Sequence, residues 1–309
     1  MIICLMGPTA AGKTKVAIDL TQKFPLEIIS VDSGMIYRGM DIGTAKPTPE
    51  ELMVAPHRLI DIIDPSATYS AAQFRIDALN EIKNILAKGN IPLLVGGTML
   101  YFRILQQGIS ILPQANAEVR AKILKEAEKF GWEKLYQHLI AIDPLSTSRI
   151  SPNDTQRIQR ALEVYELSGK TMSEWFVEER MQPLAFKFLN LIISPAQRFI
   201  LRERIAKRLE LMFQRGFVCE VEKLYARTDL NPNLPSLRAV GYRQIWQYLA
   251  GELSYITARE LANIATNQLA KRQLTWLRSF KNALWFDSED AQLIEKIAAS
   301  IFLQGNFSK

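Results

Sequence analysis

Short apolar runs alternate with amphipathic stretches over the first third of the chain. The runs with the composition of buried strands lie at residues 2–6, 26–31, 58–65 and 91–95. Between them, helical spacing of apolar positions predicts a helix just beyond residue 14 and another over 70–88, with Gly89 past its end. Strands that alternate with helices form a parallel sheet covered by helices on both faces. The pattern therefore predicts an α/β fold.

The middle of the chain has a different pattern. Over residues 112–183 no long strand pattern occurs, and the apolar spacing predicts three or four amphipathic helices. Their breaks are expected near Gly131, at Asp143, around Asn153 and at Gly169, with Asn153 as the N-cap of a following helix. We therefore expect an all-helical insertion in this stretch.

The last third returns to the sheet. Residues 188–193 again have a buried-strand composition, so the chain is expected to re-enter the core there. Long helices are predicted over 198–215 and 257–281, followed by a short strand at 283–286 and a helix from about residue 291. The predicted organisation is a first part of the core at 1–111, the insertion at 112–183, and the completed core at 184–309.

A phosphate-binding loop follows the first predicted strand. Residues 7–14 read G-x-x-x-x-G-K-T between a strand and a helix, the context that distinguishes such a loop from a chance match in a Gly-rich turn. The loop consists of Gly7, Pro8, Thr9, Ala10, Ala11, Gly12, Lys13 and Thr14. Its N–H groups can cradle phosphate, Lys13 supplies a cation, and the Thr14 hydroxyl suits Mg²⁺. The sequence predicts a P-loop NTPase-like sheet and a phosphate or diphosphate site.

Two further polar residues follow predicted strands. Asp32 comes after the strand at 26–31, at the end that faces the ligand crevice of a parallel sheet. It could bind near Mg²⁺ or act as a general base, and an Asx-turn into Gly34 is the structural alternative. Thr98 follows Gly96 and Gly97, so it either faces the crevice or caps the next helix.

Composition narrows the class of protein. The chain is 48% apolar and 23% charged, and it has no apolar run approaching the ~20 residues that span a bilayer. Its two cysteines and two histidines offer no zinc-ligand cluster, so any metal is expected to be a hard cation. Because the phosphate loop begins so near the first residue, we expect no signal peptide and a cytoplasmic protein.

Positive charge is concentrated toward the C-terminus. From residue 198 to 281 the chain has 15 Lys and Arg against 7 Asp and Glu, although its overall net charge is only +6. Arg204 and Arg208 share a helix face from which a guanidinium could reach a diphosphate. Basic residues interleave with aromatic or Gln side chains at 156–160, 238–243 and 271–278, a pattern that favours nucleic acid over solvated helix faces.

Five segments occur in a characteristic order. They are GPTAAGKT at 7–14, SVDSGMIYRGMDIGTAKP at 30–47, LLVGGTMLYF at 93–102, RAVGYRQ at 238–244 and AKRQLTWLR at 270–278. Together they resemble the tRNA dimethylallyltransferase family, in its bacterial form without a zinc finger, over essentially the whole chain. The resemblance implies transfer of a dimethylallyl group from dimethylallyl diphosphate to the N6 amine of the adenosine 3′-adjacent to the tRNA anticodon.

The resemblance also implies residue roles. Asp32 matches the family's general base, Thr98 a channel residue beside the reacting centre, and Arg208 an arginine that steadies the diphosphate. Lys13 and Thr14 match the diphosphate and Mg²⁺ contacts. The segments that match tRNA contacts comprise Asp32, Ser33, Gly34, Met35, Arg120, Gln156, Arg157, Ile158, Gln159, Arg160, Arg238, Ala239, Val240, Gly241, Tyr242, Arg243, Lys271, Arg272, Gln273, Leu274, Thr275, Trp276, Leu277 and Arg278.

Three positions depart from the family pattern. Ala11 stands where Ser is usual, and Gly34 and Met35 replace a more common pair.

The resemblance also implies partners. These are the tRNA anticodon stem-loop and dimethylallyl diphosphate, with Mg²⁺ as cofactor. It further implies no contact with a membrane and a monomeric enzyme. Two other functions use the same loop for ATP: a small-molecule or nucleoside kinase, and a non-catalytic RNA-binding ATPase.

Overall fold

The computed structural model of the chain describes residues 1–108, 112–178 and 186–305. The chain divides into two compact units: unit 1 comprises Met1–Gln106 and Ala185–Lys309, and unit 2 comprises Gln107–Leu184. The expected insertion over 112–183 falls within unit 2, although its expected end at Pro183 lies outside the described residues.

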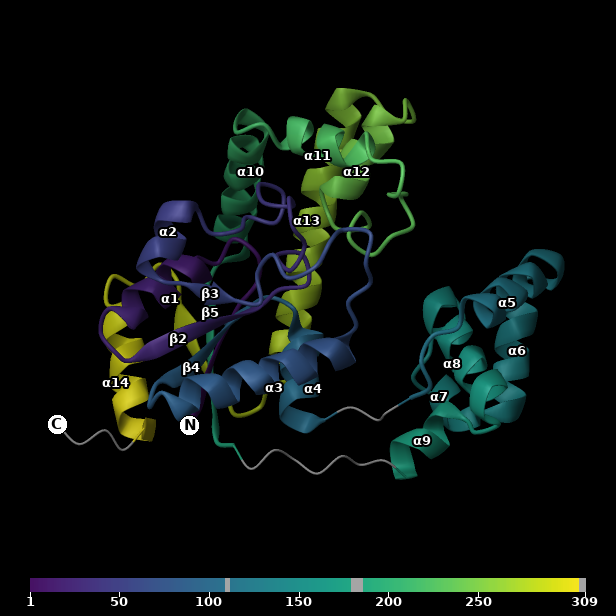
Figure 1. Cartoon of the computed structure of the whole chain (residues 1–309), viewed down its shortest axis with the longest axis horizontal. Coiled ribbons are helices and arrows are strands. Elements are labelled where there is room, and N and C mark those ends of the chain that lie inside the picture. Colours follow the sequence, from purple (N-terminus) through teal and green to yellow (C-terminus); the bar gives the residue numbers. More distant parts are fainter. Residues whose placement is uncertain (109–111, 179–185, 306–309) are drawn as a thin grey trace. The chain divides into compact units, whose positions relative to one another are not determined.

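Unit 1 is built on a six-stranded sheet in the order β3-β2-β4-β1-β5-β6, and every neighbouring pair of strands is parallel (Figure 1). The strands are β1 (Ile2–Met6), β2 (Leu26–Val31), β3 (His57–Arg58), β4 (Ile91–Gly96), β5 (Phe188–Ser194) and β6 (Leu284–Asp287). Ile2 of β1 pairs with Phe188 of β5, so the chain returns from unit 2 into the middle of the sheet. The predicted P-loop NTPase-like α/β fold is confirmed.

Helices cover both faces of this sheet (Figure 1). Helices α1 (Lys13–Thr21) and α14 (Leu293–Gly305) share one core with Ile3 and Leu5 of β1. Cys4 points to the opposite face because side chains alternate along a strand. There its thiol is 3.5 Å from the Gln106 amide of α4 (Met99–Gln107), and α4 packs on α3 (Ala71–Ala87) through stacked rings. Both faces are therefore buried, which explains the near-continuous apolar strands.

The C-terminal half of unit 1 adds a second core. It is formed around Phe217, Tyr242, Ile245 and Ala258, which are all buried. The helices involved are α10 (Arg198–Gln214), α11 (Phe217–Tyr225), α12 (Tyr242–Leu249) and α13 (Tyr255–Leu277). The sequence did not predict α11, α12 or the six-residue α2 (Pro49–Val54); each has nine residues or fewer, a short window in which to recognise a helical pattern. Helix α13 ends at Leu277, four residues earlier than predicted.

The predicted strand over residues 58–65 is wrong except at its first residue. Leu59 and Asp61 have φ angles of 60° and 56°, a left-handed conformation that interrupts an extended strand. The segment bonds instead to the loop after β2, where the N–H groups of Ile62 and Ile63 both donate to the carbonyl of Ile36. The apolar run at 58–65 therefore bonds to a loop instead of extending the sheet.

Unit 2 is helical over its described residues. Its helices are α5 (Ala117–Phe130), α6 (Trp132–Ile142), α7 (Pro144–Thr147), α8 (Thr155–Ser168) and α9 (Met172–Glu178). They enclose a small core that includes Ile123, Leu139 and Leu162. The breaks at Gly131, Asp143 and Gly169 are confirmed. The N-cap of α8 is Asp154 rather than Asn153: its Oδ1 accepts the Arg157 N–H at 3.2 Å.

Candidate active site

Three functional loops meet because their strands are neighbours. The phosphate loop, Asp32 and Thr98 follow β1, β2 and β4, which lie side by side in the sheet as β2-β4-β1. The carboxyl ends of parallel strands share one edge, where α/β proteins bind ligands. A cavity of about 1590 Å³ opens there, and it is lined by Lys13, Asp32, Thr98 and Arg208 among others. The sheet order therefore brings the phosphate loop, Asp32 and Thr98 together, and Arg208 reaches the same cavity from α10.

The phosphate loop is held in a tight curve. A side chain at Gly7 would place its Cβ 2.4 Å from the carbonyl oxygen of Ile193, so only glycine fits beside β5. Gly12 has a φ of 86°, and Ala10 adopts the left-handed region at 63° although it carries a side chain. Helix α1 begins directly after this curve, so its first N–H groups lack helical partners and can donate to an anion.

Lys13 and Arg208 place two cations at this loop. The Lys13 ammonium donates to the carbonyls of Gly7 at 3.0 Å and Pro8 at 2.8 Å, which leaves a third N–H for a ligand. Arg208 reaches the loop from α10 and donates to the Thr9 hydroxyl. Among the described residues, neither cation forms a salt bridge at contact distance. The pair is therefore suited to an anionic ligand.

Burial lowers the pKa of both cations. Desolvation lowers the pKa of Lys13 to about 8; the carboxylate of Asp32 opposes this shift and the positive charge of Arg208 adds to it. Desolvation also lowers the pKa of Arg208, again against the attraction of Asp32. A bound diphosphate would reverse the penalty by supplying the missing negative charge. The site is thus electrostatically incomplete without an anion.

Asp32 forms the predicted Asx-turn and still faces the cavity. Its Oδ1 accepts the N–H groups of Gly34 at 2.8 Å and Met35 at 3.4 Å. These bonds fix the carboxylate through one oxygen, and the group lines the same cavity as Lys13. The Asx-turn is therefore compatible with a functional role, because the turn orients a carboxylate that could accept a proton.

Thr98 connects two of the loops. Its hydroxyl accepts the N–H of Ser33 at 3.0 Å, and its own N–H donates to the carbonyl of Val31 at 3.2 Å. The position of the Asp32 loop therefore depends on the loop after β4. The hydroxyl reaches across to a neighbouring strand's loop, which places it at the cavity beside Asp32.

Gln273 of α13 clamps the phosphate loop, a role that its place in a predicted tRNA segment did not suggest. Its Oε1 accepts the Thr9 N–H at 2.8 Å, and its Nε2 donates to the Gly97 carbonyl at 2.9 Å. The sequence held a signal for this orientation. Gln273 continues the stripe of buried residues on α13 formed by Ala262, Thr266, Ala270 and Leu277.

Replacing Gln273 with alanine is expected to weaken the binding of diphosphate to the loop about tenfold and to lower the free energy of unfolding by about 1–3 kcal/mol, because two backbone groups lose their partner. Equilibrium titration with inorganic diphosphate and thermal unfolding measure the two effects. Asn267→Ala is the matched control, since its amide bonds back to Asn263 on the same helix. Equal behaviour of the two variants would contradict the clamp.

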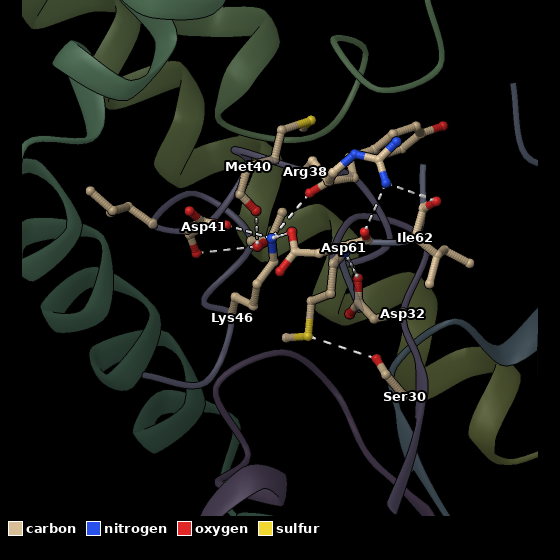
Figure 2. A network of polar contacts seen from close by, with 12 residues as sticks. Ser30, Asp32, Arg38, Met40, Asp41, Lys46, Asp61 and Ile62 are labelled. Atoms are coloured by element: carbon tan, nitrogen blue, oxygen red, sulfur yellow. Dashed lines mark hydrogen bonds and ion pairs between the residues drawn. The ribbon is translucent and has the colours of Figure 1, made fainter. Parts of the chain in front are cut away.

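A buried lysine holds one wall of the cavity, where it contacts Asp41 and Asp61 (Figure 2). The side chain of Lys46 is only 4% exposed, and its ammonium donates to the Tyr37 carbonyl at 3.0 Å, to Asp61 at 2.6 Å and to Asp41. This network ties the loop after β2 to the segment that follows β3. No motif in the sequence assigned Lys46 a role.

Glu220 of α11 also holds this wall. Its carboxylate accepts the N–H groups of Asp41, Ile42 and Gly43 at 2.9, 2.7 and 3.1 Å, and the Tyr242 hydroxyl at 2.6 Å. Together with Lys46 it fixes the loop of residues 41–46, which also lines the cavity. These contacts join residues far apart in the chain, so the sequence alone did not reveal them.

The predicted tRNA segments of unit 1 reach the cavity. Arg238, Arg272, Gln273 and Trp276 line it together with Ser33, Gly34 and Met35. Arg238, Arg243, Lys271 and Arg278 are exposed. Tyr242 and Leu277 are buried, so these segments could contact a partner only through their neighbours.

The predicted tRNA residues of unit 2 form one group. Arg120 of α5 lies beside the α8 segment, where Gln159 donates to its carbonyl at 3.3 Å. Gln156 and Arg157 are exposed, whereas Ile158 is buried in the core of the unit. Two segments that are 36 residues apart in the chain thus share a surface.

The fold and site together define a phosphate-loop protein whose cavity brings two buried cations, Lys13 and Arg208, together with the carboxylate of Asp32. Comparison with known families then identifies the family: the family model described as IPP transferase matches residues 35–280, so the chain belongs to the IPP transferase family. No helix of the described ranges is long and apolar enough to cross a membrane.

Two named relatives are similar in sequence to this chain over most of its length. A tRNA dimethylallyltransferase of Coxiella burnetii (strain Dugway 5J108-111) is 57% identical over 96% of this chain and 95% of its own. One from Thioalkalivibrio sulfidiphilus (strain HL-EbGR7) is 59% identical over 90% of this chain and 87% of its own.

Solved structures show the same fold. The tRNA isopentenylpyrophosphate transferase of Bacillus halodurans superposes with a TM-score of 0.72 at 35% identity, covering 98% of this chain and 95% of that one. A eukaryotic dimethylallyltransferase described as acting on tRNA gives a TM-score of 0.81 at 26% identity, over 98% and 79% of the chains. The family predicted from the sequence is therefore confirmed, and these comparisons do not favour the kinase.

Proposed function

We propose that this chain is a tRNA prenyltransferase that moves a dimethylallyl group from dimethylallyl diphosphate to the N6 amine of the adenosine 3′-adjacent to the tRNA anticodon. One observation carries the proposal: Asp32 shares a cavity with the anion clamp of Lys13 and Arg208 and interacts electrostatically with both. A base and a leaving-group site side by side are what transfer from a diphosphate to an amine requires.

Each residue has a place in this reaction. The amine nitrogen attacks the allylic carbon, the carbon–oxygen bond to diphosphate breaks, and the diphosphate leaves with the electron pair. Lys13, Arg208 and the first N–H groups of α1 stabilise the negative charge that grows on it. Asp32 accepts the proton released by the amine. Thr98 holds the Asp32 loop through Ser33, and so positions the base.

Magnesium fits the donor set of the cavity. Hard oxygen ligands suit Mg²⁺, and the hydroxyl of Thr14 at the start of α1 lies in the cavity that would hold the diphosphate oxygens. No group of three or more His, Cys, Asp or Glu that could hold a metal occurs in the described parts of the chain. We therefore propose that Thr14 and the diphosphate together would bind the ion, which would neutralise charge on the leaving group.

The same reaction implies a partner and a cellular setting. The exposed basic side chains at 238–243 and 271–278 in unit 1, and Arg120 with 156–160 in unit 2, would contact the anticodon stem-loop. A single chain supplies every reacting group of the cavity, which supports a monomer. Its substrate tRNA supports action in the cytoplasm.

One assay tests the function. The protein is incubated with labelled dimethylallyl diphosphate or with ATP, each with and without unmodified tRNA. We expect label from the prenyl donor in tRNA, with release of diphosphate. Consumption of ATP with no label in tRNA would overturn the proposal and favour a kinase or an ATPase.

Donor binding should depend on pH through Lys13. Below pH 8 its ammonium is protonated with or without donor, so the dissociation constant is flat. Above pH 8 the free protein loses this proton and must regain it on binding, so affinity falls by up to about tenfold per pH unit. Donor titrations between pH 7 and 10 measure this. Lys13→Arg, which stays charged, should flatten the curve; the same slope in both proteins would contradict the assignment.

A further inference from the structure

A buried carboxylate in unit 2 binds two of the arginines proposed to contact tRNA. Glu163 of α8 is 0% exposed, and its Oε1 accepts the Nε of Arg120 at 2.9 Å while Oε2 accepts its Nη2 at 3.3 Å. Oε2 also accepts Nη1 of Arg160 at 2.6 Å. The Asn116 N–H donates to Oε1 at 2.8 Å. The carboxylate of Glu163 therefore joins its own helix α8 to both the N-cap and the first turn of α5.

Glu163 stays ionised in this setting. Burial alone would raise its pKa, but the hydrogen bonds from Arg120, Arg160 and Asn116 hold the pKa below its usual value. Two guanidinium groups surround one carboxylate, so the cluster carries a net charge of one positive unit. A buried charge of this kind is retained only where its partners satisfy it.

The two arginines keep donors for a ligand. Arg120 uses Nε and one terminal nitrogen for Glu163, its side chain is 45% exposed, and its other terminal nitrogen can still donate outward. Arg160 is fixed at both ends of its fork, by Glu163 and by the Pro113 carbonyl at 2.6 Å; these bonds use two of its five N–H groups and leave three. Both long side chains are thus immobilised before any RNA binds, which removes part of the entropy cost of binding.

We propose that Glu163 is a positioning residue for RNA: it acts through Arg120 and Arg160 to present fixed guanidinium groups to the phosphates of the stem-loop substrate. The proposal rests on the proposed function, because it requires unit 2 to contact RNA. Phosphate contacts fix the register of a protein on its nucleic acid. Glu163 should therefore raise selectivity for the correct stem-loop rather than general affinity for RNA.

The variant Glu163→Gln separates geometry from charge. A neutral amide offers one oxygen, and its NH₂ opposes a guanidinium, so one arginine loses its fixed place. The same change raises the local charge by one positive unit. Fluorescence anisotropy with the substrate stem-loop and with an unrelated RNA hairpin, each at several salt concentrations, measures both effects. We expect about tenfold weaker binding of the substrate and equal or tighter binding of the unrelated hairpin.

Other outcomes would overturn the proposal. If Glu163 only offsets charge, both RNAs will bind Glu163→Gln more tightly; if it only supports the fold, the thermal midpoint will fall while both affinities stay unchanged. Glu166→Gln is the matched control, since Glu166 lies one turn further along α8 and pairs with the exposed Lys122 at 3.0 Å. It should bind both RNAs as the wild type does.

A second variant covers the case in which Glu163→Gln does not fold. Arg120→Lys keeps the charge at an exposed position but loses the two-bond fork to Glu163. It should also weaken substrate binding while leaving the unrelated hairpin unchanged, and wild-type selectivity would overturn the proposal. The proposed function fails separately, if the wild-type protein neither binds nor prenylates the stem-loop.

Discussion

Replacing Asp32 with asparagine is expected to lower kcat by about 10²–10⁴-fold, the range for loss of a general base. Donor binding should stay unchanged or become tighter, because the carboxylate sits near Lys13 and Arg208 and its negative charge opposes a diphosphate. Single-turnover transfer to tRNA measures the chemical step, and equilibrium titration with the donor measures affinity. This combination of a slower reaction with undiminished donor binding identifies a base.

Asparagine also separates the base from the turn. Its side-chain oxygen can still accept the Gly34 N–H, as Asp32 does at 2.8 Å, whereas alanine loses that bond as well. Equal losses in Asp32→Asn and Asp32→Ala would show that the carboxylate matters more than the turn. Markedly weaker donor binding in Asp32→Asn would instead identify Asp32 as part of a metal site, and contradict the assignment.

Replacing Arg208 with alanine is expected to lower kcat/KM about 10²–10³-fold, the loss seen when one donor to a developing negative charge is removed. The guanidinium is desolvated, contacts the Thr9 hydroxyl and has no carboxylate at contact distance among the described residues. Its charge is therefore available to the leaving group. The rate of diphosphate release in the presence of tRNA measures the effect.

Arg204 provides the matched control for Arg208. It lies one helical turn earlier on α10, where it bonds the Ser288 hydroxyl at 3.0 Å and pairs with Glu289. Arg204→Ala removes an equal charge from the same helix face and should change kcat/KM far less. Similar losses in the two variants would indicate a general electrostatic effect rather than a contact of Arg208 with the diphosphate.

Local patterns were sufficient for the main elements of the fold. Buried strands such as β1 and β4 are short and apolar throughout. Helix α3 follows Ser70, whose side chain caps it, and ends before Gly89, which has a left-handed conformation. These signals lie within a few residues of one another, so tertiary context does not override them. The strand predicted at 58–65 was wrong for the opposite reason: hydrogen bonds to the loop at Ile36 determine its backbone conformation.

The residues of the candidate site also fall into two groups, those that local sequence patterns predicted and those whose roles depend on distant partners. Asp32 and Thr98 could be predicted because each follows a strand, and strand ends meet at one edge of a parallel sheet. The roles of Gln273 and Lys46 could not be, because their partners, Thr9 with Gly97 and Tyr37 with Asp61, lie on other elements. Only the buried stripe on α13 hinted that Gln273 points inward.

By itself the sequence determined the class of fold, the phosphate loop and the family, because glycine spacing, apolar runs and motif order are local properties of the chain. The tertiary structure decided which cations and carboxylates share a cavity, and which charges are already paired. Arg204 and Arg208 look alike in the sequence, yet packing gives one a carboxylate partner and leaves the other for an anion. Long-range packing sets desolvation and pairing, and these determine what a charged side chain can do.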